Sequence, residues 1–156
     1  MSASETPGRT VQMSGLSELG GTHLGYTDWQ EMTQDRVNRF ADVTDDHNYI
    51  HVDVERARSS PFGGTVAHGY LTLSLLAPVT SQLLRIDDAG MMVNYGLDRV
   101  RFPAPVPVGE RWRGGAEVLE VSEVAGGFQL RVLATIEVQG SEKPSLVAVC
   151  VFRAYA

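Results

Sequence analysis

The sequence lacks several features that mark particular classes of protein. Cysteine occurs once, at Cys150, so no disulfide can form within the chain. Residues 146–152 around it are apolar, and nothing there would lower the pKa of a thiol, so we expect a buried small side chain and not a nucleophile. No apolar run reaches the roughly eighteen residues needed to span a bilayer, and residues 1–10 do not resemble a signal peptide. These absences lead us to expect a cytoplasmic protein.

An excess of basic residues is also lacking, because 13 Lys and Arg stand against 19 Asp and Glu, a net charge of −6. Nucleic acids and acidic membrane surfaces need a basic footprint, so we expect neither as the main partner. An anionic small ligand could still bind a local cluster. Arg99 with Arg101, and Arg111 with Arg113, form such pairs, although solvated strand faces explain either pair equally well.

Two common catalytic and binding motifs are missing as well. The turn at residues 59–64 is rich in glycine but lacks the Gly-Lys-Ser/Thr ending of a nucleotide-binding P-loop. Ser74 lies in an apolar segment without the flanking glycines of a nucleophile elbow. We therefore assign no phosphate role to the turn and no nucleophilic role to the serine.

The 156 residues suffice for one domain with a core, after a loosely ordered lead-in at residues 1–20 that is rich in Ser, Gly and Thr. Thr33 is a candidate N-cap of a helix that ends near Asp45. Residues 68–84 are apolar on nearly every side, which predicts a buried helix. Pro78 falls inside that helix and predicts a kink or a break.

The second half of the chain predicts strands. Residues 91–102, 110–124, 128–138 and 145–155 are separated by turns that contain Pro or Gly. Apolar and polar residues alternate in the third, as in an antiparallel strand with one wet face, and the fourth is apolar on both faces. The order predicts an α+β fold in which an antiparallel sheet wraps around one long central helix.

Asp46 and His51 carry the clearest chemical signal, because a carboxylate and an imidazole lie five positions apart in a predicted turn. Such a pair can take a proton from water and return it, as the hydration of a polarised double bond requires. Asn48 between them can hold the turn through its own backbone. A surface Asp and a structural His are the alternative interpretation of the same two residues.

His68 and Gly69 open the buried helix. The first N–H groups of a helix have no intrahelical partner, and Gly69 has no side chain to keep a substrate carbonyl away from its N–H. His47 and His51 could also be a metal pair completed by Asp46 or His68, but four-residue spacing suits a metal on a helix and this segment predicts a turn. We therefore predict no metal site, and we predict an enzyme that adds water to, or removes it from, an activated acyl chain.

Residues 46–53 (Asp-His-Asn-Tyr-Ile-His-Val-Asp) and 68–73 (His-Gly-Tyr-Leu-Thr-Leu) closely resemble the MaoC-like (R)-specific enoyl-CoA hydratases, in particular their nodulation protein N-like branch. The resemblance implies a hot-dog fold over residues 21–156, assembled as a homodimer or a higher oligomer. It implies reversible syn hydration of trans-2-enoyl-CoA to (R)-3-hydroxyacyl-CoA, with no cofactor beyond the CoA thioester substrate.

Carried over by position, Asp46 and His51 would be the catalytic pair, the Gly69 N–H would polarise the thioester carbonyl, and Asn48 and His68 would support the site. Arg99 and Arg101 are then candidates for binding CoA. Two alternatives stay open, namely an acyl-CoA thioesterase on the same fold and a non-catalytic acyl-binding subunit.

Overall fold

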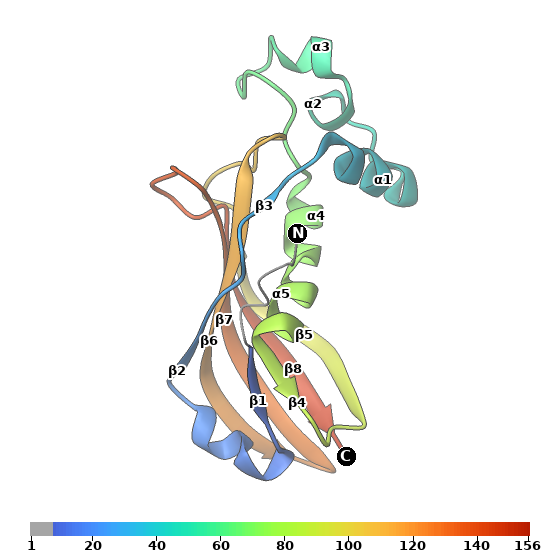
Figure 1. Ribbon diagram of the computed structural model, residues 1–156. Helices are drawn as coiled ribbons and strands as arrows, with labels where there is room; N and C mark the ends of the chain where they lie inside the picture. Colours follow the sequence, from blue (N-terminus) through green and yellow to red (C-terminus); the bar gives the residue numbers. More distant parts are fainter. Residues whose placement is uncertain (1–7) are drawn as a thin grey trace, which may run out of the picture.

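A computed structural model describes residues 8–156 and shows one sheet wrapped around a helix (Figure 1). Six antiparallel strands form the sheet, in the order β2-β6-β7-β8-β5, with β3 also paired to β6. They are β2 (Thr22–Tyr26), β3 (Gln30–Glu31), β5 (Met91–Arg101), β6 (Arg111–Val124), β7 (Gly127–Val138) and β8 (Leu146–Tyr155). The four long strands lie within one or two residues of the predicted ranges, and the α+β architecture is confirmed.

The alternation predicted for β7 determines which face packs on the core. Leu130, Val132, Ala134 and Ile136 are almost completely buried, while the residues between them are partly exposed. β8, the neighbour of β7, is apolar on both faces and has strands on both sides. β5 forms one edge of the sheet and leaves several large apolar side chains exposed.

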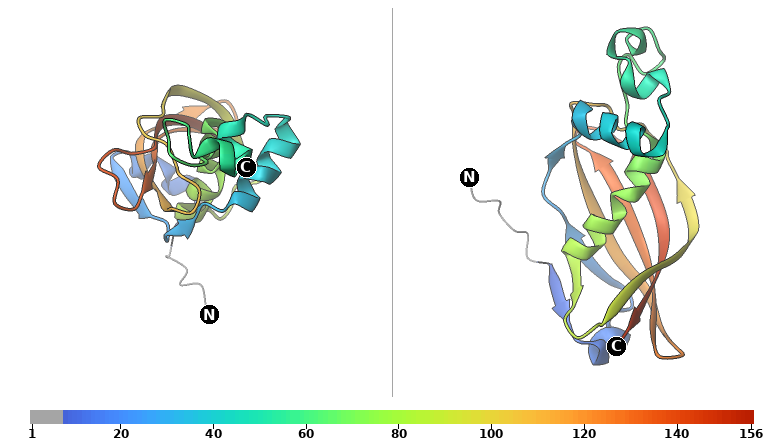
Figure 2. Two further views of the ribbon diagram at one scale, coloured as in Figure 1. Left: turned by 90° about the horizontal axis from the view of Figure 1, so that it is seen from above. Right: turned by 90° about the vertical axis from the view of Figure 1, so that its right-hand side faces the viewer.

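The central helix consists of two segments, α4 (Gly69–Ser74) and α5 (Leu76–Leu83), and crosses the concave side of the sheet (Figure 2). The break was predicted at Pro78 but falls at Leu75, one turn earlier. Proline has no N–H to donate to the carbonyl four residues before it, here that of Ser74, and its ring crowds that carbonyl. Pro78 itself lies in the first turn of α5, where a missing N–H costs nothing.

Part of the N-terminal segment is packed, in contrast to the loosely ordered lead-in that we expected for residues 1–20. A 3₁₀ helix, η1 (Met13–Leu19), buries Leu16 and Leu19, which share one face because such a helix repeats every three residues. Before it, β1 (Arg9–Val11) pairs in parallel with β4 (Leu84–Ile86), which follows the central helix. Residues 1–7 lie outside the described part of the chain.

Three short helices stand at one end of the sheet, above the start of α4 (Figure 1). They are α1 (Gln34–Thr44), α2 (Tyr49–Val52) and α3 (Val54–Ala57). The Thr33 side chain caps α1 as predicted, accepting from the Arg36 N–H at 3.2 Å, and Asp45 ends it at a φ of 59°. Among the described residues, no helix is long and apolar enough to cross a membrane.

Candidate active site

Asp46 lies in the short connection between α1 and α2, and His51 lies inside α2. The segment predicted as a turn therefore becomes a one-turn helix at its end. Asn48 is the N-cap, because its side-chain oxygen accepts from the Ile50 N–H at 3.5 Å. The Asp46 carboxylate accepts from the Asn48 N–H at 3.3 Å. Asn48 thus forms hydrogen bonds on both sides, to the Asp46 carboxylate and at the start of the helix that contains His51.

Hydrogen bonds fix the His51 ring and assign its tautomer. Its Nδ1 lies 2.7 Å from the Val66 carbonyl oxygen. A carbonyl can only accept, so Nδ1 carries the proton and donates it, and the Nε2 of the neutral ring keeps a free lone pair. The Val66 N–H in turn donates to the Ile50 carbonyl at 3.0 Å. Two hydrogen bonds thus join Val66 to α2, one from the His51 ring and one to the backbone.

The pKa of His51 is lowered from its ordinary value, and burial is the main cause. The hydrogen bond to the Val66 carbonyl opposes this by stabilising the charged ring. The nearby His68 lowers the pKa further, and Asp46 raises it. The net result is a ring that is neutral near pH 7 and able to accept a proton.

His68 precedes α4 and is 1% exposed. Its Nε2–H donates to the backbone carbonyl of Asp46 at 3.0 Å, and its ring stacks on that of His51 with centroids 3.8 Å apart and planes inclined by 26°. Its Nδ1 is buried and has no hydrogen-bond partner within residues 8–156. The sequence indicated that His68 supports the site, but only the structure shows this stacking.

One carboxylate oxygen of Asp46 and one ring nitrogen from each of His51 and His68 lie within 4.8 Å of one another. A metal would have to lie in the planes of both imidazole rings. Two stacked rings inclined by 26° have planes that meet far beyond bonding distance, so the two histidines cannot share one ion in this arrangement. His47, the other histidine of the metal hypothesis, is exposed and pairs with Asp42 at 2.9 Å instead.

Gly69 and His51 line one cavity of about 390 Å³. The rest of its wall was not predicted from the sequence. It comes from α2, the 59–64 turn, the residues around α4, the connection between β5 and β6, and the residue before β8. This wall consists of Ile50, Phe62, Val66, Ala67, Thr72, Phe102, Pro103, Ala104, Pro105, Val106 and Ser145. Asp46 is exposed and does not line this cavity, although its carboxylate lies within 4.8 Å of a ring nitrogen of each histidine.

Arg99 and Arg101 flank a second cavity, of about 400 Å³, whose wall also includes Pro103. The two cavities therefore adjoin. Val100 packs against the core, so the two arginines project from the opposite face of β5. Among the described residues, neither arginine has an ion pair, whereas Arg113 of the other predicted cluster pairs with Glu137.

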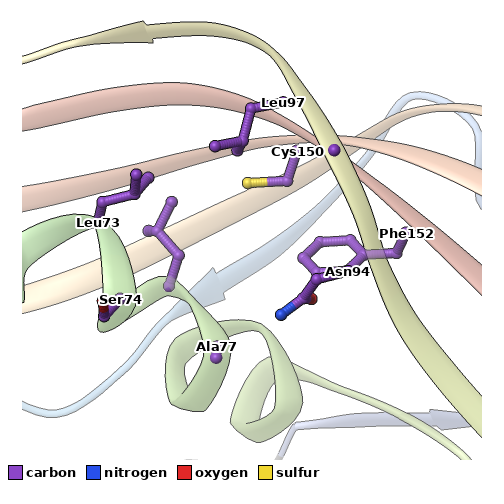
Figure 3. A pocket seen from close by; sticks show the side chains of 9 residues that line it. Leu73, Ser74, Ala77, Asn94, Leu97, Cys150 and Phe152 are labelled. Carbon is purple, nitrogen blue, oxygen red and sulfur yellow. The ribbon is translucent and has the colours of Figure 1, made fainter. Parts of the chain in front are cut away.

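A third, apolar cavity of about 280 Å³ lies between the central helix and the strands β5 and β8 (Figure 3). Leu73 and Ala77 line its helix side, and Leu97 and Phe152 line its strand side. Cys150 directs its sulfur into this space, and burial raises the pKa of the thiol to about 11. The predicted burial of the cysteine is confirmed, and its low reactivity stays a prediction.

Comparison with known proteins places the chain in a family. The model of the MaoC like domain matches residues 17–139. The 3-hydroxyacyl-thioester dehydratase Z of Mycobacterium tuberculosis is 46% identical over 139 residues, which cover 88% of this chain and 92% of that protein. Nodulation protein N of Rhizobium leguminosarum bv. viciae is 45% identical over 132 residues, 82% of this chain and 81% of that protein.

Solved structures agree on the fold. The (R)-hydratase of A. caviae involved in PHA biosynthesis superposes with a TM-score of 0.72 at 22% identity, covering 85% of this chain and 94% of that one. This likeness shows the hot-dog fold, which the two paired motifs of the sequence had implied. The chain therefore belongs to the MaoC-like dehydratase family, whose name denotes hydro-lyase enzymes.

Proposed function

We propose that the protein is an (R)-specific enoyl-CoA hydratase, acting reversibly as a 3-hydroxyacyl-CoA dehydratase. The observation that carries this is the grouping of the Asp46 carboxylate with the His51 ring beside the Gly69 N–H. Two groups that each hold the same water at about 2.8 Å in tetrahedral geometry are roughly 4.6 Å apart. The spread of up to 4.8 Å in this cluster suits one bridging water.

In the hydration direction the water oxygen bonds to C3 of the enoyl chain. One proton of the water passes to the pair, for which the free Nε2 of His51 is an acceptor, and the pair supplies the proton that C2 takes up. Both the hydroxyl group and the proton come from one side of the double bond, so the addition is syn. The pair returns to its starting charge after each turnover.

The N–H of Gly69 is the proposed donor to the thioester oxygen. As water attacks C3, negative charge moves onto this oxygen, and a fixed N–H that points at it stabilises the enolate-like state. Gly69 begins α4, so its N–H has no intrahelical partner. It lines the same cavity as His51, which brings the carbonyl and the water together.

The two other cavities suit the two ends of an acyl-CoA. Arg99 and Arg101, which form no ion pair within residues 8–156, offer cations for the CoA phosphates next to Pro103, which borders the cavity of His51. The apolar cavity along α4 and α5 suits the acyl chain. We propose that the CoA thioester is the only small molecule required, with no metal or other cofactor, so a chelator should leave the activity unchanged.

The edge strand β5 supports a homodimer as part of the proposal. It is 11 residues long and exposes Met91, Met92, Tyr95 and Leu97. Long apolar edge strands invite pairing with another strand, and a second copy of this chain would cover both the side chains and the free backbone groups. Light scattering coupled to gel filtration should give twice the chain mass of 17.0 kDa or a higher multiple.

A chain-length series of trans-2-enoyl-CoA substrates tests the proposed function, with loss of the enoyl thioester absorbance as the signal. We expect hydration of crotonyl-CoA or a longer homologue, with the thioester intact afterwards. Release of free CoA thiol would indicate the thioesterase instead. Saturable acyl-CoA binding without any turnover would identify a non-catalytic subunit. Cell fractionation would test the proposed cytoplasmic location.

A further inference from the structure

Two features of His68 are not explained by its place at the start of the helix. The ring is 1% exposed, yet Nδ1 has no hydrogen-bond partner in the described part of the chain. A buried polar atom without a partner costs free energy that an apolar side chain of similar size would avoid. We therefore expect the His68 ring to make contacts with its neighbours that an apolar side chain would not make.

The first neighbour is the peptide group of Asp46. The Nε2–H of His68 donates to the Asp46 carbonyl at 3.0 Å. This bond joins the connection between α1 and α2 to the residue that precedes Gly69. The carboxylate and the proposed oxyanion donor are thereby held in one unit, although 23 positions separate them in the sequence.

The second neighbour is the ring of His51, on which His68 stacks at 3.8 Å. On its other side His68 meets Phe40 of α1, with ring centroids 4.9 Å apart and planes inclined by 56°. The His51 ring is thus fixed in orientation by a face contact as well as by the bond to the Val66 carbonyl. At this separation His68 also lowers the pKa of His51.

We infer that His68 is the positioning residue of the catalytic pair, holding Asp46 through its peptide carbonyl and keeping the stacked His51 ring oriented and uncharged. The inference rests on the proposed function of Asp46 and His51. The charged and titratable groups that act on His51 are Asp46, from the connection after α1, and His68. Among the described residues lining its cavity, no other side chain titrates.

Two substitutions separate the two contacts. His68→Phe keeps a ring against His51 and Phe40 but removes the N–H that binds the Asp46 carbonyl. His68→Gln keeps an amide N–H within reach of that carbonyl but removes the ring. We expect His68→Phe to lower kcat by roughly tenfold to a hundredfold, because small displacements of catalytic groups have effects of this size, with KM little changed. His68→Gln should retain more of the kcat.

Both variants should also shift the acid limb of the kcat profile to higher pH, since the influence of His68 that lowers the pKa of His51 is gone. NMR titration of the His51 ring protons in the wild type and in His68→Phe measures the same shift without any turnover. His47→Gln is the control, because His47 is exposed, pairs with Asp42 and does not belong to the group of Asp46, His51 and His68. It should change neither the pH dependence of kcat nor the NMR titration of His51.

The inference is overturned if His68→Phe folds and keeps the wild-type kcat, if its loss falls on KM alone, or if the His51 titration does not move. Equal damage in both variants would overturn the role of the bond to Asp46. If the wild type hydrates no enoyl thioester, the proposed function fails, and the NMR titration still decides whether His68 controls the charge of His51.

Discussion

Substitution of Gly69 by alanine separates activity from stability, because the structure leaves room for the new methyl group. A Cβ built on Gly69 would lie 3.5–3.7 Å from the ring of Phe102, which is ordinary van der Waals contact. Gly69 also does not have the positive φ that would strain an alanine. The fold should therefore accept Gly69→Ala without rearrangement.

The methyl group would lie beside the N–H that we propose for the thioester oxygen. Alanine keeps the N–H, but its methyl group would hold the thioester oxygen away from it. A lost contact with one oxyanion donor typically costs about 10²–10³ in kcat, so we expect Gly69→Ala to lower kcat/KM by about 10². Alanine is up to about 1 kcal/mol better than glycine in a helix, less at its first position. At about 2–4 °C per kcal/mol for a chain of this size, the melting temperature should stay equal or rise slightly.

Two measurements test this prediction. The absorbance of the enoyl-CoA gives kcat/KM for hydration, and circular dichroism gives the melting temperature. Gly15→Ala is the matched control, since its Cβ would meet nothing within 4 Å and the residue lies in η1, away from the site. The reasoning fails if Gly69→Ala keeps wild-type kcat/KM, or if its activity disappears together with its fold while Gly15→Ala stays normal.

Further predictions concern the pair, the pH dependence and the thiol. Asp46→Asn and His51→Gln should each reduce kcat by at least about 10³ while the fold persists, and the double variant should be little worse than either, because the two act as a unit; additive losses would contradict this. The lowered pKa of His51 means that the folded ring stays neutral to a pH below its ordinary 6.5, so activity should persist there and fall only as the pH drops further. Just below pH 6.5 the His51 ring of the unfolded chain binds more protons than that of the folded chain, so its contribution to the free energy of unfolding should fall as the pH drops. Urea unfolding between about pH 5 and 7 measures this, and a free energy of unfolding that rises toward acid would contradict it. Cys150 should resist a thiol reagent at pH 8 in the native protein and react rapidly in denaturant, whereas fast labelling without denaturant would show that the cavity of Figure 3 is open to reagents.

Much of the fold could be predicted from the sequence because its signals are local. The alternation between residues 128 and 138 and the Pro- and Gly-bearing turns located the four long strands to within two residues. Capping by Thr33 depends on a residue three positions away, so the start of α1 was visible as well, whereas the helix that Asn48 caps was predicted only as a turn. The paired motifs around His51 and Gly69 were sufficient to recognise the family.

The rest depends on contacts between distant segments. Nothing in residues 13–19 signals that Leu16 and Leu19 will be buried, because their partners belong to a sheet formed much later in the chain. The helix breaks at Leu75 because Pro78 cannot donate a hydrogen bond to the carbonyl of Ser74. The break therefore lies one turn before the proline that causes it. The stacking of His68 on His51 joins two segments 17 positions apart, and no periodicity records it.

The stereochemistry of hydration in deuterated water tests the central proposal most directly. A single water held between Asp46 and His51 should deliver hydroxyl and deuterium to the same face of the trans-2-enoyl chain, and chiral analysis should give only the (R)-3-hydroxyacyl product. An (S) product, or hydroxyl and deuterium on opposite faces, would show that the two additions come from different sides and would contradict the account.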